Sequence, residues 1–584
     1  MTTVGTTALT VARVVPNVTG LDKHFDYLIP ESLRAQVAIG SLVRVPLHGR
    51  RVAGWVVAIG DADPGFGIER LMPLAKWSSI GPSAELIELA HWAATRWGSD
   101  RLRPFLVAAS PPTMVAGLPP SRRAVRLGGT AGAGGAGSGV VRIGPLADPL
   151  PLVLEAAGTG PALVLHPSAP AARALASRLR REGLTVAVVP DEWAAAAAGV
   201  DVVVGSRAAA WAPCPAPAVV VVLDEHDEAY QEERTPTWHA RDVLIERAVR
   251  AGATCTLVSP CPTATAMRWA GGSVQRTIQA SQWPLIEIDD RGEVEPWKRS
   301  LVGSSLIRAL RDPAKRVVCV LNTVGRARLI ACRSCRNLQR CEHCEAAVRQ
   351  RDDAMFECPR CNTVRPKVCQ VCGASAMALV KPGVARLREE LHAAANRPVL
   401  AVTGESDELP APEVAAVANV FVGTEAVLHR VRNVDVVAFL DFDAELLAPR
   451  YRAGEQAMAL LVRAGRLVGA RERGGRVIVQ THAPHHEVLQ AAVLGDTGRL
   501  VDGELARRRL LGLPPFRALA AVDGADAEAL ALATGLEYAA TPKGVLVRAD
   551  DWLTLGRALA EAAATKGTRT KGSRLRVAVD PPRV

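Results

Sequence analysis

Eight of the twelve cysteines in this chain lie between Cys332 and Cys372 and form four Cys-x-x-Cys pairs. The pairs are Cys332/Cys335, Cys341/Cys344, Cys358/Cys361 and Cys369/Cys372. A two-residue spacer lets both thiolates of a pair face one tetrahedral ion, and four thiolates complete a closed zinc site. The pattern therefore predicts two Zn²⁺ ions per chain, with a structural role because no coordination position stays open.

The lengths between the pairs suggest nesting, in which the inner pairs close a loop over Glu345–Glu357 and the outer pairs close around them. A disulfide cluster is the alternative, but a reducing compartment favours metal and nothing in the sequence indicates secretion. His343 lies between two ligands in Cys341-Glu-His-Cys344 and could replace a thiolate. With eight cysteines available, we expect its side chain to point to solvent.

Two carboxylates, Asp224 and Glu225, follow the apolar run Ala218–Leu223, a position at which nucleotide hydrolases hold magnesium. An Asp-Glu pair after a strand is a weak signal by itself. A phosphate-binding loop also needs Gly-Lys-Ser/Thr, whose amides and lysine hold phosphates and whose hydroxyl holds Mg²⁺. None of the nine lysines follows a glycine. We therefore expect neither ATP nor Mg²⁺ as a cofactor.

The third candidate is the sequence Phe25-Asp26-Tyr27. One interpretation is a strand with two aromatic side chains in the core and an acid at its edge. The other is a pocket for a terminal nucleotide, because an aromatic face can stack on a base and a carboxylate can accept a hydrogen bond from a 3′-hydroxyl. An acid next to phosphates is otherwise costly, which favours a specific role for Asp26.

The elements that must position these residues follow from hydrophobic patterning. The N-terminal part is mostly β, with a hairpin turn at 48–51 and a helix over Ala84–Trp97. The glycine-rich stretch Gly128–Gly139 is typical of a flexible linker. Two sets of short apolar runs follow, as expected for buried strands of parallel sheets. These runs are 162–165, 185–189, 200–204, 218–223 and 254–258 in the first set, and 317–321, 399–402, 417–422, 434–440 and 476–480 in the second.

Composition sets further limits. A chain of 584 residues with 49% hydrophobic residues forms several globular domains, and no run is apolar and long enough to span a membrane. Met1–Val15 lacks the features of a signal peptide, so we expect a cytoplasmic protein. The net charge of +11 favours a polyanionic partner, although arginine-rich composition can have other origins. The run Arg507–Arg509 and the basic tail after Lys566 either bind phosphates or are solvated charge.

Eight motifs occur in an order seen in one known family. They are His24–Pro30, Gly40–Pro46, Val204–Arg207, Leu223–Asp227, the cysteine array, Val422–Glu425, Gln480–His482 and Leu511–Phe516. Together they resemble the PriA family of bacterial replication-restart helicases, over nearly the whole chain. The cysteine array, inserted within the second α/β set, is the most specific of these motifs.

The resemblance implies a multidomain α/β fold with a β-rich DNA-binding domain, two RecA-like helicase lobes, an inserted double zinc ribbon and a C-terminal α+β domain. It implies that Phe25, Asp26, Tyr27 and Gly49 grip the 3′ end of a nascent leading strand, although the turn with Gly49 is one residue shorter than in the family. The predicted domains are 1–110 (3′-end binding), 111–148 (linker), 149–283 (lobe 1), 284–330 with 374–488 (lobe 2), 331–373 (zinc module) and 489–584 (C-terminal domain).

The resemblance also implies which cysteines share a metal. Cys332, Cys335, Cys369 and Cys372 would hold one zinc, and Cys341, Cys344, Cys358 and Cys361 the other.

The chain departs from the family in its motor motifs. Ala156–Gly160 leads directly into the run at 162–165, which we interpret as a helix end and turn, with the whole P-loop unit deleted. The family's Asp-Glu-Glu-His is one acid short at Asp224-Glu225-His226, and the last helicase motif keeps only Arg466 of two arginines. A degenerate nucleotide site of this kind predicts a helicase-like protein that does not hydrolyse ATP.

The expected function is recognition of stalled or abandoned replication forks, meaning branched DNA with a leading-strand 3′ end. The protein, which we expect to be a monomer, would promote primosome assembly and loading of the replicative helicase. Implied partners are primosome proteins, the replicative helicase and its loader, and single-stranded DNA-binding protein. Two alternatives stay open: an active ATP-dependent 3′→5′ helicase with a non-standard nucleotide site, and a zinc-ribbon interaction scaffold in the primosome.

Overall fold

The computed structural model describes residues 10–21, 23–61, 71–99, 101–123, 137–276, 282–292, 302–321, 330–351, 354–379, 384–402, 419–541, 544–565 and 575–582. Most of the glycine-rich stretch and of the basic tail (Lys566, Arg569, Lys571 and Arg574) lies outside these residues. The chain divides into two compact units. Unit 1 comprises Met1–Gly139, Pro149–Val258 and Gly512–Pro581, and unit 2 comprises Val140–Asp148, Ser259–Leu511 and Pro582–Val584.

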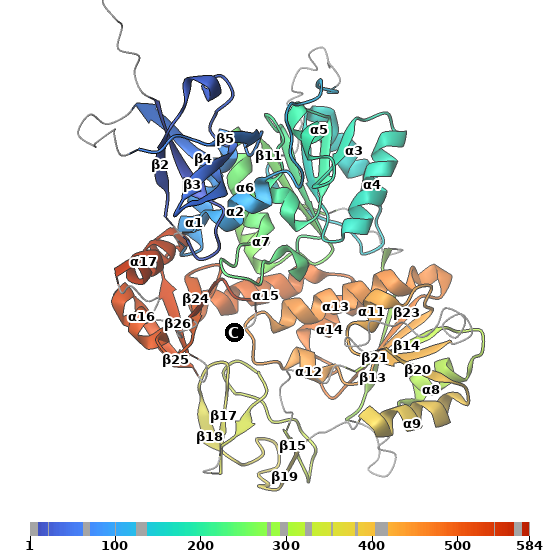
Figure 1. The fold of residues 1–584 in the computed structure, drawn as a ribbon. Helices are drawn as coiled ribbons and strands as arrows, with labels where there is room; N and C mark the ends of the chain where they lie inside the picture. Colours follow the sequence, from blue (N-terminus) through green and yellow to red (C-terminus); the bar gives the residue numbers. More distant parts are fainter. Residues whose placement is uncertain are drawn as a thin grey trace, which may run out of the picture. The chain divides into compact units, whose positions relative to one another are not determined.

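Unit 1 begins with a five-stranded antiparallel sheet in the order β2-β1-β4-β3-β5 (Figure 1). Its strands are β1 (Thr10–Pro16), β2 (Phe25–Leu28), β3 (Leu42–Leu47), β4 (Arg50–Asp61) and β5 (Lys76–Ser79). His48 and Gly49 form the two-residue turn between β3 and β4, with φ of 46° and 76°. Positive φ at both turn positions matches the right-handed twist of a hairpin. The hairpin predicted at 48–51 is therefore confirmed.

Helices follow this sheet. The predicted helix is present as α1 (Ala84–Arg96), where Ser83 accepts a hydrogen bond from the Leu86 N–H and so caps the first turn. A shorter helix, α2 (Arg103–Ala109), comes next.

The second sheet of unit 1 is parallel, with strands in the order β11-β10-β7-β9-β8. The strands are β7 (Ala162–Leu165), β8 (Val186–Val188), β9 (Val202–Gly205), β10 (Val219–Leu223) and β11 (Thr254–Ser259). Helix α3 (Leu150–Thr159) precedes β7, and helices α4 (Ala169–Arg181), α5 (Trp193–Ala198) and α6 (Ala240–Ala251) lie between later strands in the chain. Every residue of β10 is buried, as expected for a strand covered on both faces.

A third sheet of unit 1 comes from the C-terminal part. It is antiparallel, in the order β25-β26-β24-β27, and is packed with helices α16 (Ala527–Thr534) and α17 (Trp552–Thr565). Its strands are β24 (Ala518–Asp523), β25 (Glu537–Thr541), β26 (Gly544–Ala549) and β27 (Arg576–Val579).

Unit 2 contains a six-stranded parallel sheet in the order β13-β23-β22-β14-β21-β20. The strands are β13 (Leu285–Asp290), β14 (Val317–Val320), β20 (Val399–Val402), β21 (Val420–Gly423), β22 (Val436–Phe439) and β23 (Arg476–Thr481). Alternate residues enter two separate cores: Val318 and Val320 pack in one, Val317 and Cys319 in the other. Burial on both faces explains why these strands are continuously apolar.

The helices of unit 2 are α7 (Ala264–Ala270), α8 (Ser304–Arg311), α9 (Val384–Ala395), α11 (Val427–Arg430), α12 (Asp443–Leu446), α13 (Ala453–Val468), α14 (Glu487–Leu494) and α15 (Thr497–Leu510). Within the described ranges, no helix is long and apolar enough to cross a membrane.

The cysteine-rich module is inserted between β14 and α9. It consists of two small sheets: β15 (Ile330–Cys332) pairs with β19 (Met377–Leu379), and β17 (Met355–Glu357) lies between β16 (Arg349–Gln350) and β18 (Val364–Pro366). The β15–β19 pair brings the first and last strands of the module together, so the chain enters and leaves the module at neighbouring positions.

Candidate functional site

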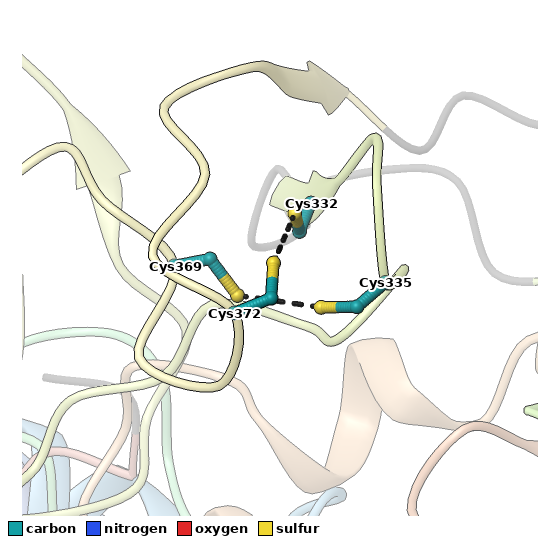
Figure 2. A group of neighbouring side chains, drawn as sticks. All are labelled: Cys332, Cys335, Cys369 and Cys372. Atoms are coloured by element: carbon teal, nitrogen blue, oxygen red, sulfur yellow. Dashed lines mark hydrogen bonds between the residues drawn. The ribbon is translucent and has the colours of Figure 1, made fainter.

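The eight cysteines form two separate clusters. Figure 2 shows the first, in which Cys332 and Cys335 face Cys369 and Cys372 from two loops. The Sγ atoms of Cys332 and Cys372 lie 3.5 Å apart, and those of Cys335 and Cys369 3.4 Å apart. The second cluster contains Cys341, Cys344, Cys358 and Cys361, with Sγ–Sγ distances of 3.3–3.5 Å. These are the groupings that the resemblance implied.

The four Cys-x-x-Cys turns share one backbone geometry. In each turn the residue after the second cysteine has positive φ, and its N–H donates to the carbonyl of the first cysteine at 2.9–3.0 Å. The residues in this position are Arg336, Glu345, Asn362 and Gly373. The repeated turn aims both sulfurs of each pair in one direction. The same sequence spacing therefore accompanies the same local geometry in all four turns.

The donor set fits a tetrahedral metal ion. With Zn–S bonds of about 2.3 Å, the sulfurs of a Cys₄ site lie about 3.8 Å apart, close to the distances found here. Backbone N–H groups of His343, Arg360 and Val371 point at the sulfurs of Cys341, Cys358 and Cys369 at 3.4 Å. Such donors stabilise thiolates, the form that binds metal. The hydrogen bond between Cys344 and Cys358 lowers the pKa of the Cys358 thiol and raises that of the Cys344 thiol.

Neither cluster is disulfide-bonded, since all eight sulfurs are free and lie much farther apart than the roughly 2.05 Å of an S–S bond. The side chain of His343 is 68% exposed, as expected. The two clusters could hold metal ions, and the closed set of four sulfurs in each gives them a structural role.

The second cluster is attached to the helical part of unit 2. The Ala347 N–H donates to the Leu447 carbonyl at 2.9 Å, and Leu338 and Ala347 pack in the core beneath the six-stranded sheet. The Arg360 guanidinium contacts the carbonyls of Cys344 and Tyr451. A metal in this cluster would therefore also fix the module's attachment.

The Phe25-Asp26-Tyr27 motif lies on β2, where side chains alternate between the two faces of the sheet. Tyr27 is 4% exposed in the core, and its hydroxyl donates to the Pro46 carbonyl of β3 at 3.0 Å. Phe25 is half-buried against the same core. Asp26 points to the other face, where Arg13 of β1 binds both of its oxygens.

The residues of the motif thus differ in how accessible they are to a DNA ligand. The ring of Tyr27 is enclosed and cannot stack on a base in this structure, whereas the carboxylate of Asp26 is 37% exposed. Gly49 lies in the turn after β3, and a Cβ built there meets no atom within 4 Å. Tyr27 connects the motif to this hairpin through Pro46.

Asp224 and Glu225 follow β10, as the sequence predicts. Glu225 is 1% exposed and accepts a 2.7 Å hydrogen bond from Arg241 of α6, which also pairs with Asp242. Burial alone would lower the pKa of Arg241, but the two carboxylates outweigh it and the pKa is raised. Glu225 is therefore held in a buried ion pair.

The expectation that the whole P-loop unit is deleted is wrong. The helix end and turn are present where predicted, as α3 and Gly160. However, a further strand, β6 (Gly139–Arg142), precedes α3 and pairs with β12 (Val274–Arg276). Strand, loop and helix thus follow one another in the chain, and only the loop's phosphate-binding residues are missing. The sequence pattern missed β6 because its four residues directly follow the glycine-rich stretch.

The loop after β6 is held by other parts of unit 2. Arg466, the remaining arginine of the last helicase motif, donates from Nε to the Pro145 carbonyl at 2.9 Å. Arg142 binds Asp496 at 3.1 Å and the Thr497 hydroxyl at 3.2 Å. In an active motor, loop amides and an arginine meet at the phosphates. Here Arg466 contacts a loop carbonyl, and the Arg142 side chain contacts Asp496 and Thr497.

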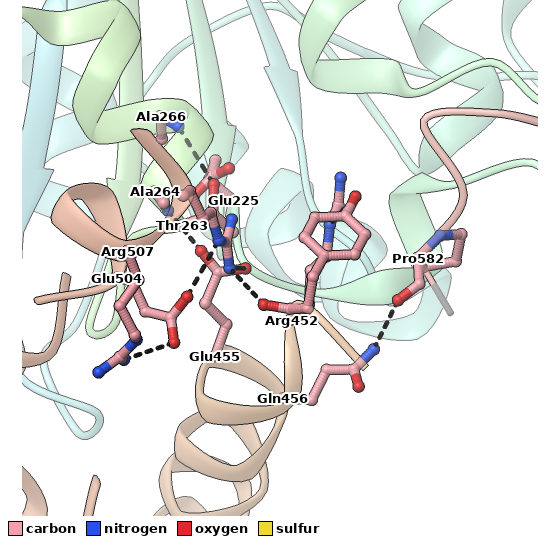
Figure 3. A network of polar contacts seen from close by, with 12 residues as sticks. Glu225, Thr263, Ala264, Ala266, Arg452, Glu455, Gln456, Glu504, Arg507 and Pro582 are labelled. Atoms are coloured by element: carbon pink, nitrogen blue, oxygen red, sulfur yellow. Dashed lines mark hydrogen bonds and ion pairs between the residues drawn. The ribbon is translucent and has the colours of Figure 1, made fainter. Parts of the chain in front are cut away.

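A buried polar network joins α7, α13 and α15 (Figure 3). Glu455 of α13 accepts from the Ala264 N–H at the start of α7 at 2.6 Å and pairs with Arg508 of α15 at 3.0 Å. Arg508 also binds Glu504, which in turn pairs with Arg507. Neither interpretation of the Arg507–Arg509 run holds for Arg508, which is 1% exposed. The side chain of Arg507 is 36% exposed and forms ion pairs with Glu487 and Glu504. The sequence did contain a signal for these ion pairs, because Glu504 precedes Arg507 and Arg508 at the i,i+3 and i,i+4 spacing that brings side chains together on a helix.

Known proteins resemble this chain along most of its length. A family model described as the 3′ DNA-binding domain (3′BD) of PriA matches residues 13–103. The replication restart protein PriA of Bacillus subtilis is 27% identical over 58% of this chain and 45% of that protein. The probable replication restart protein PriA of Mycobacterium leprae is 29% identical over 87% of this chain and 86% of that protein.

Several of these alignments, including that with the B. subtilis protein, cover only about half of the relative's length. Among solved structures, Saccharomyces cerevisiae Dbp5 bound to RNA and ADP BeF3 is 12% identical, with a TM-score of 0.32, over 64% of this chain and 89% of that one. The family match at the N-terminus includes β2, and the similarity to curated relatives extends over most of the described units. Over most of its length, the chain is similar to replication restart proteins of the PriA family.

Proposed function

We propose that this protein binds branched DNA at stalled replication forks, through the 3′ end of the leading strand, and promotes primosome assembly without unwinding DNA. The observation that carries the proposal is the exposed carboxylate of Asp26 within the region that matches a 3′ DNA-binding domain. The proposed end site consists of Phe25, Asp26 and Gly49, with Tyr27 supporting it from the core.

Three observations support a motor without ATP hydrolysis. The loop between β6 and α3 has no lysine or hydroxyl for phosphate and magnesium. Glu225 is paired with Arg241, and Arg466 is bound to the Pro145 carbonyl. The phosphate-binding residues are thus missing from the loop, and Glu225 and Arg466 are held by protein. The helicase-like part would then serve as a scaffold.

The metal proposed for both cysteine clusters is zinc, because four thiolates at tetrahedral spacing favour Zn²⁺ over cations that prefer oxygen ligands. Bound zinc would neutralise the sulfur charge and fix the four turns. The module would then present a rigid surface beside the attachment at Leu447 and Tyr451. The replicative helicase, its loader, other primosome proteins and single-stranded DNA-binding protein are the proposed partners.

The end site is tested with fluorescently labelled forks that differ only in the leading-strand terminus, 3′-hydroxyl or 3′-phosphate, at matched ionic strength. A carboxylate accepts a hydrogen bond from the hydroxyl but repels the phosphate, and such charged hydrogen bonds contribute about 1.5–3 kcal/mol. Blocking the end should therefore weaken binding by about tenfold or more. Asp26→Ala should remove most of this difference and leave salt-dependent binding nearly intact.

Glu31→Ala is the matched control, because it also removes an exposed acid from unit 1 but lies outside the motif. It should keep the full preference for the hydroxyl end. Equal affinity of the unmodified protein for both forks would refute the end site. Weak binding to every fork at moderate salt would instead favour a scaffold that contacts proteins alone.

A further inference from the structure

Arg13 lies directly opposite Asp26 in the antiparallel pair β1–β2. Its Nε donates to Asp26 Oδ1 at 3.0 Å and its Nη2 to Oδ2 at 3.2 Å, so the guanidinium binds the carboxylate with two parallel hydrogen bonds. The neighbours Ala12 and Val14 are fully buried, which leaves Arg13 as the one exposed position in this part of β1.

The backbone changes register at this point. β1 pairs with β4 regularly up to Arg13, opposite Ala58, and then continues with Val14 opposite Val56. The additional residue on β4 makes a β-bulge, a feature that redirects side chains and is frequent beside functional sites. The irregularity thus coincides with the residue that holds Asp26.

The stability of the sheet does not account for this pair. The Arg13 and Asp26 side chains are 50% and 37% exposed, and ion pairs this accessible contribute little to folding. Two-point contact instead fixes the orientation of a carboxylate. Each carboxylate oxygen has a second lone pair, so the bound carboxylate can still accept a hydrogen bond.

The pair also resolves an electrostatic conflict. A terminal 3′-hydroxyl lies next to the last phosphodiester of its strand, and an unpaired carboxylate at that place would repel the phosphate. With Arg13 bound, the pair has no net charge, and the arginine offers further N–H donors near the phosphate.

We propose that Arg13 is a positioning residue of the 3′-end site, which orients the Asp26 carboxylate toward the terminal hydroxyl and cancels its charge toward the last phosphodiester. This inference rests on the proposed end recognition by Asp26. It assigns Arg13 a role in distinguishing strand ends, in addition to general attraction of DNA.

The experiment measures the affinity ratio between 3′-hydroxyl and 3′-phosphate forks for Arg13→Gln, Asp26→Asn and the double variant in the full-length protein. Arg13→Gln should reduce the ratio by about fivefold or more, because the carboxylate loses the two-point contact that orients it toward the hydroxyl. In the Asp26→Asn background the same change should have little effect, since there is no carboxylate to position. Arg13→Lys keeps the charge but not the two-point contact, and should retain part of the ratio.

Arg44→Gln is the matched control, an exposed arginine of β3 in the same sheet. It should weaken binding to both forks equally. If Arg13→Gln also weakens both forks equally, or acts the same with and without Asp26, Arg13 is only a phosphate contact and the inference is wrong. If the unmodified protein does not distinguish the two forks, the proposed recognition of the 3′ end itself fails. This failure is detected with the unmodified protein alone, so it can be told apart from a failure of the role proposed for Arg13. Circular dichroism melting of each variant identifies loss of fold.

Discussion

Asp26 and Tyr27 are adjacent in the sequence and have opposite roles in the structure. Alternation along β2 places the Tyr27 ring in the core and the Asp26 carboxylate on the outer face. The first interpretation of the motif, with aromatic side chains in the core, therefore describes Tyr27. The functional interpretation stays a proposal for Asp26.

Tyr27→Phe should lower the free energy of unfolding by about 1 kcal/mol, because the Pro46 carbonyl loses its hydrogen-bond donor while the ring still fills the core. The preference for a 3′-hydroxyl fork should be unchanged. Urea denaturation and the fork-affinity ratio measure the two effects. Tyr538→Phe, a half-buried tyrosine in β25, is the control. A large loss of end preference in Tyr27→Phe with unchanged stability would show that the hydroxyl contacts DNA.

At the scale of elements, α13 and α15 are joined by buried charges rather than by apolar contacts alone. Glu455 lies between the α7 backbone and Arg508, and Glu504 lies between Arg507 and Arg508. Removing one partner of a buried pair leaves the other charge uncompensated, which is more damaging than replacing the pair as a whole. The network is thus a structural requirement of this part of unit 2.

Glu455→Gln should reduce stability at pH 7 by about 3 kcal/mol, while Glu472→Gln, an exposed control, should change it little. Burial raises the pKa of Glu455, but Arg508 and Arg452 outweigh it and the pKa is lowered. A lowered folded pKa means that the contribution is complete above the unfolded pKa and disappears as pH falls through the folded value. The difference between the unmodified protein and Glu455→Gln should therefore shrink in acid. Melting temperatures between pH 7 and pH 3 test this, and a constant difference would contradict the assignment.

The two cysteine clusters are separate sets of ligands, so each should lose its metal independently. Cys341→Ser should reduce the zinc content from two to one per chain, and Cys332→Ser should do the same through the other cluster. His343→Ala is the control and should keep both ions, because its side chain is exposed. Elemental analysis of purified proteins gives the count. Retention of two ions in Cys341→Ser would refute the grouping.

At the scale of the whole molecule, the parallel sheets are complete, whereas the loop after β6 lacks the lysine and the hydroxyl of a phosphate-binding loop. Strand, loop and helix remain around 139–159, but the loop contacts Arg466 through a carbonyl instead of presenting lysine to phosphate. The fold depends mainly on the residues of the hydrophobic core, whereas nucleotide chemistry depends on a few residues in loops. A motor can therefore lose its chemistry and keep its architecture.

Millimolar ATP with Mg²⁺ should leave the melting temperature unchanged, because a ligand stabilises a protein only in proportion to its binding to the folded state. Phosphate release in the presence of forked DNA should stay at background. Glu225→Gln serves as the reference, since it keeps the volume of a side chain that pairs with Arg241. DNA-stimulated turnover that disappeared in Glu225→Gln would establish an active, non-standard nucleotide site.

The sequence by itself determined the features that depend on local spacing. The four Cys-x-x-Cys turns, the His48-Gly49 hairpin and the parallel strands β7–β11, β14 and β20–β23 were predicted, because turn geometry and burial on both faces restrict which residue types occur. Motif order was sufficient to indicate the family. Each of these features can be identified from a short stretch of sequence, either a few residues of a turn or one continuously apolar strand.

Only the tertiary structure decided which distant groups meet. The pairing of β6 with β12, the contact of Arg466 with Pro145, and the burial of Arg508 between Glu455 and Glu504 join segments that are far apart in the chain. The Arg13–Asp26 pair depends on the register of two strands. The residues around a charged side chain in the sequence do not show whether it is solvated or forms an ion pair, because its partner is brought close only by tertiary packing. That is why the run at Arg507–Arg509 could be predicted as surface charge and yet contain a buried arginine.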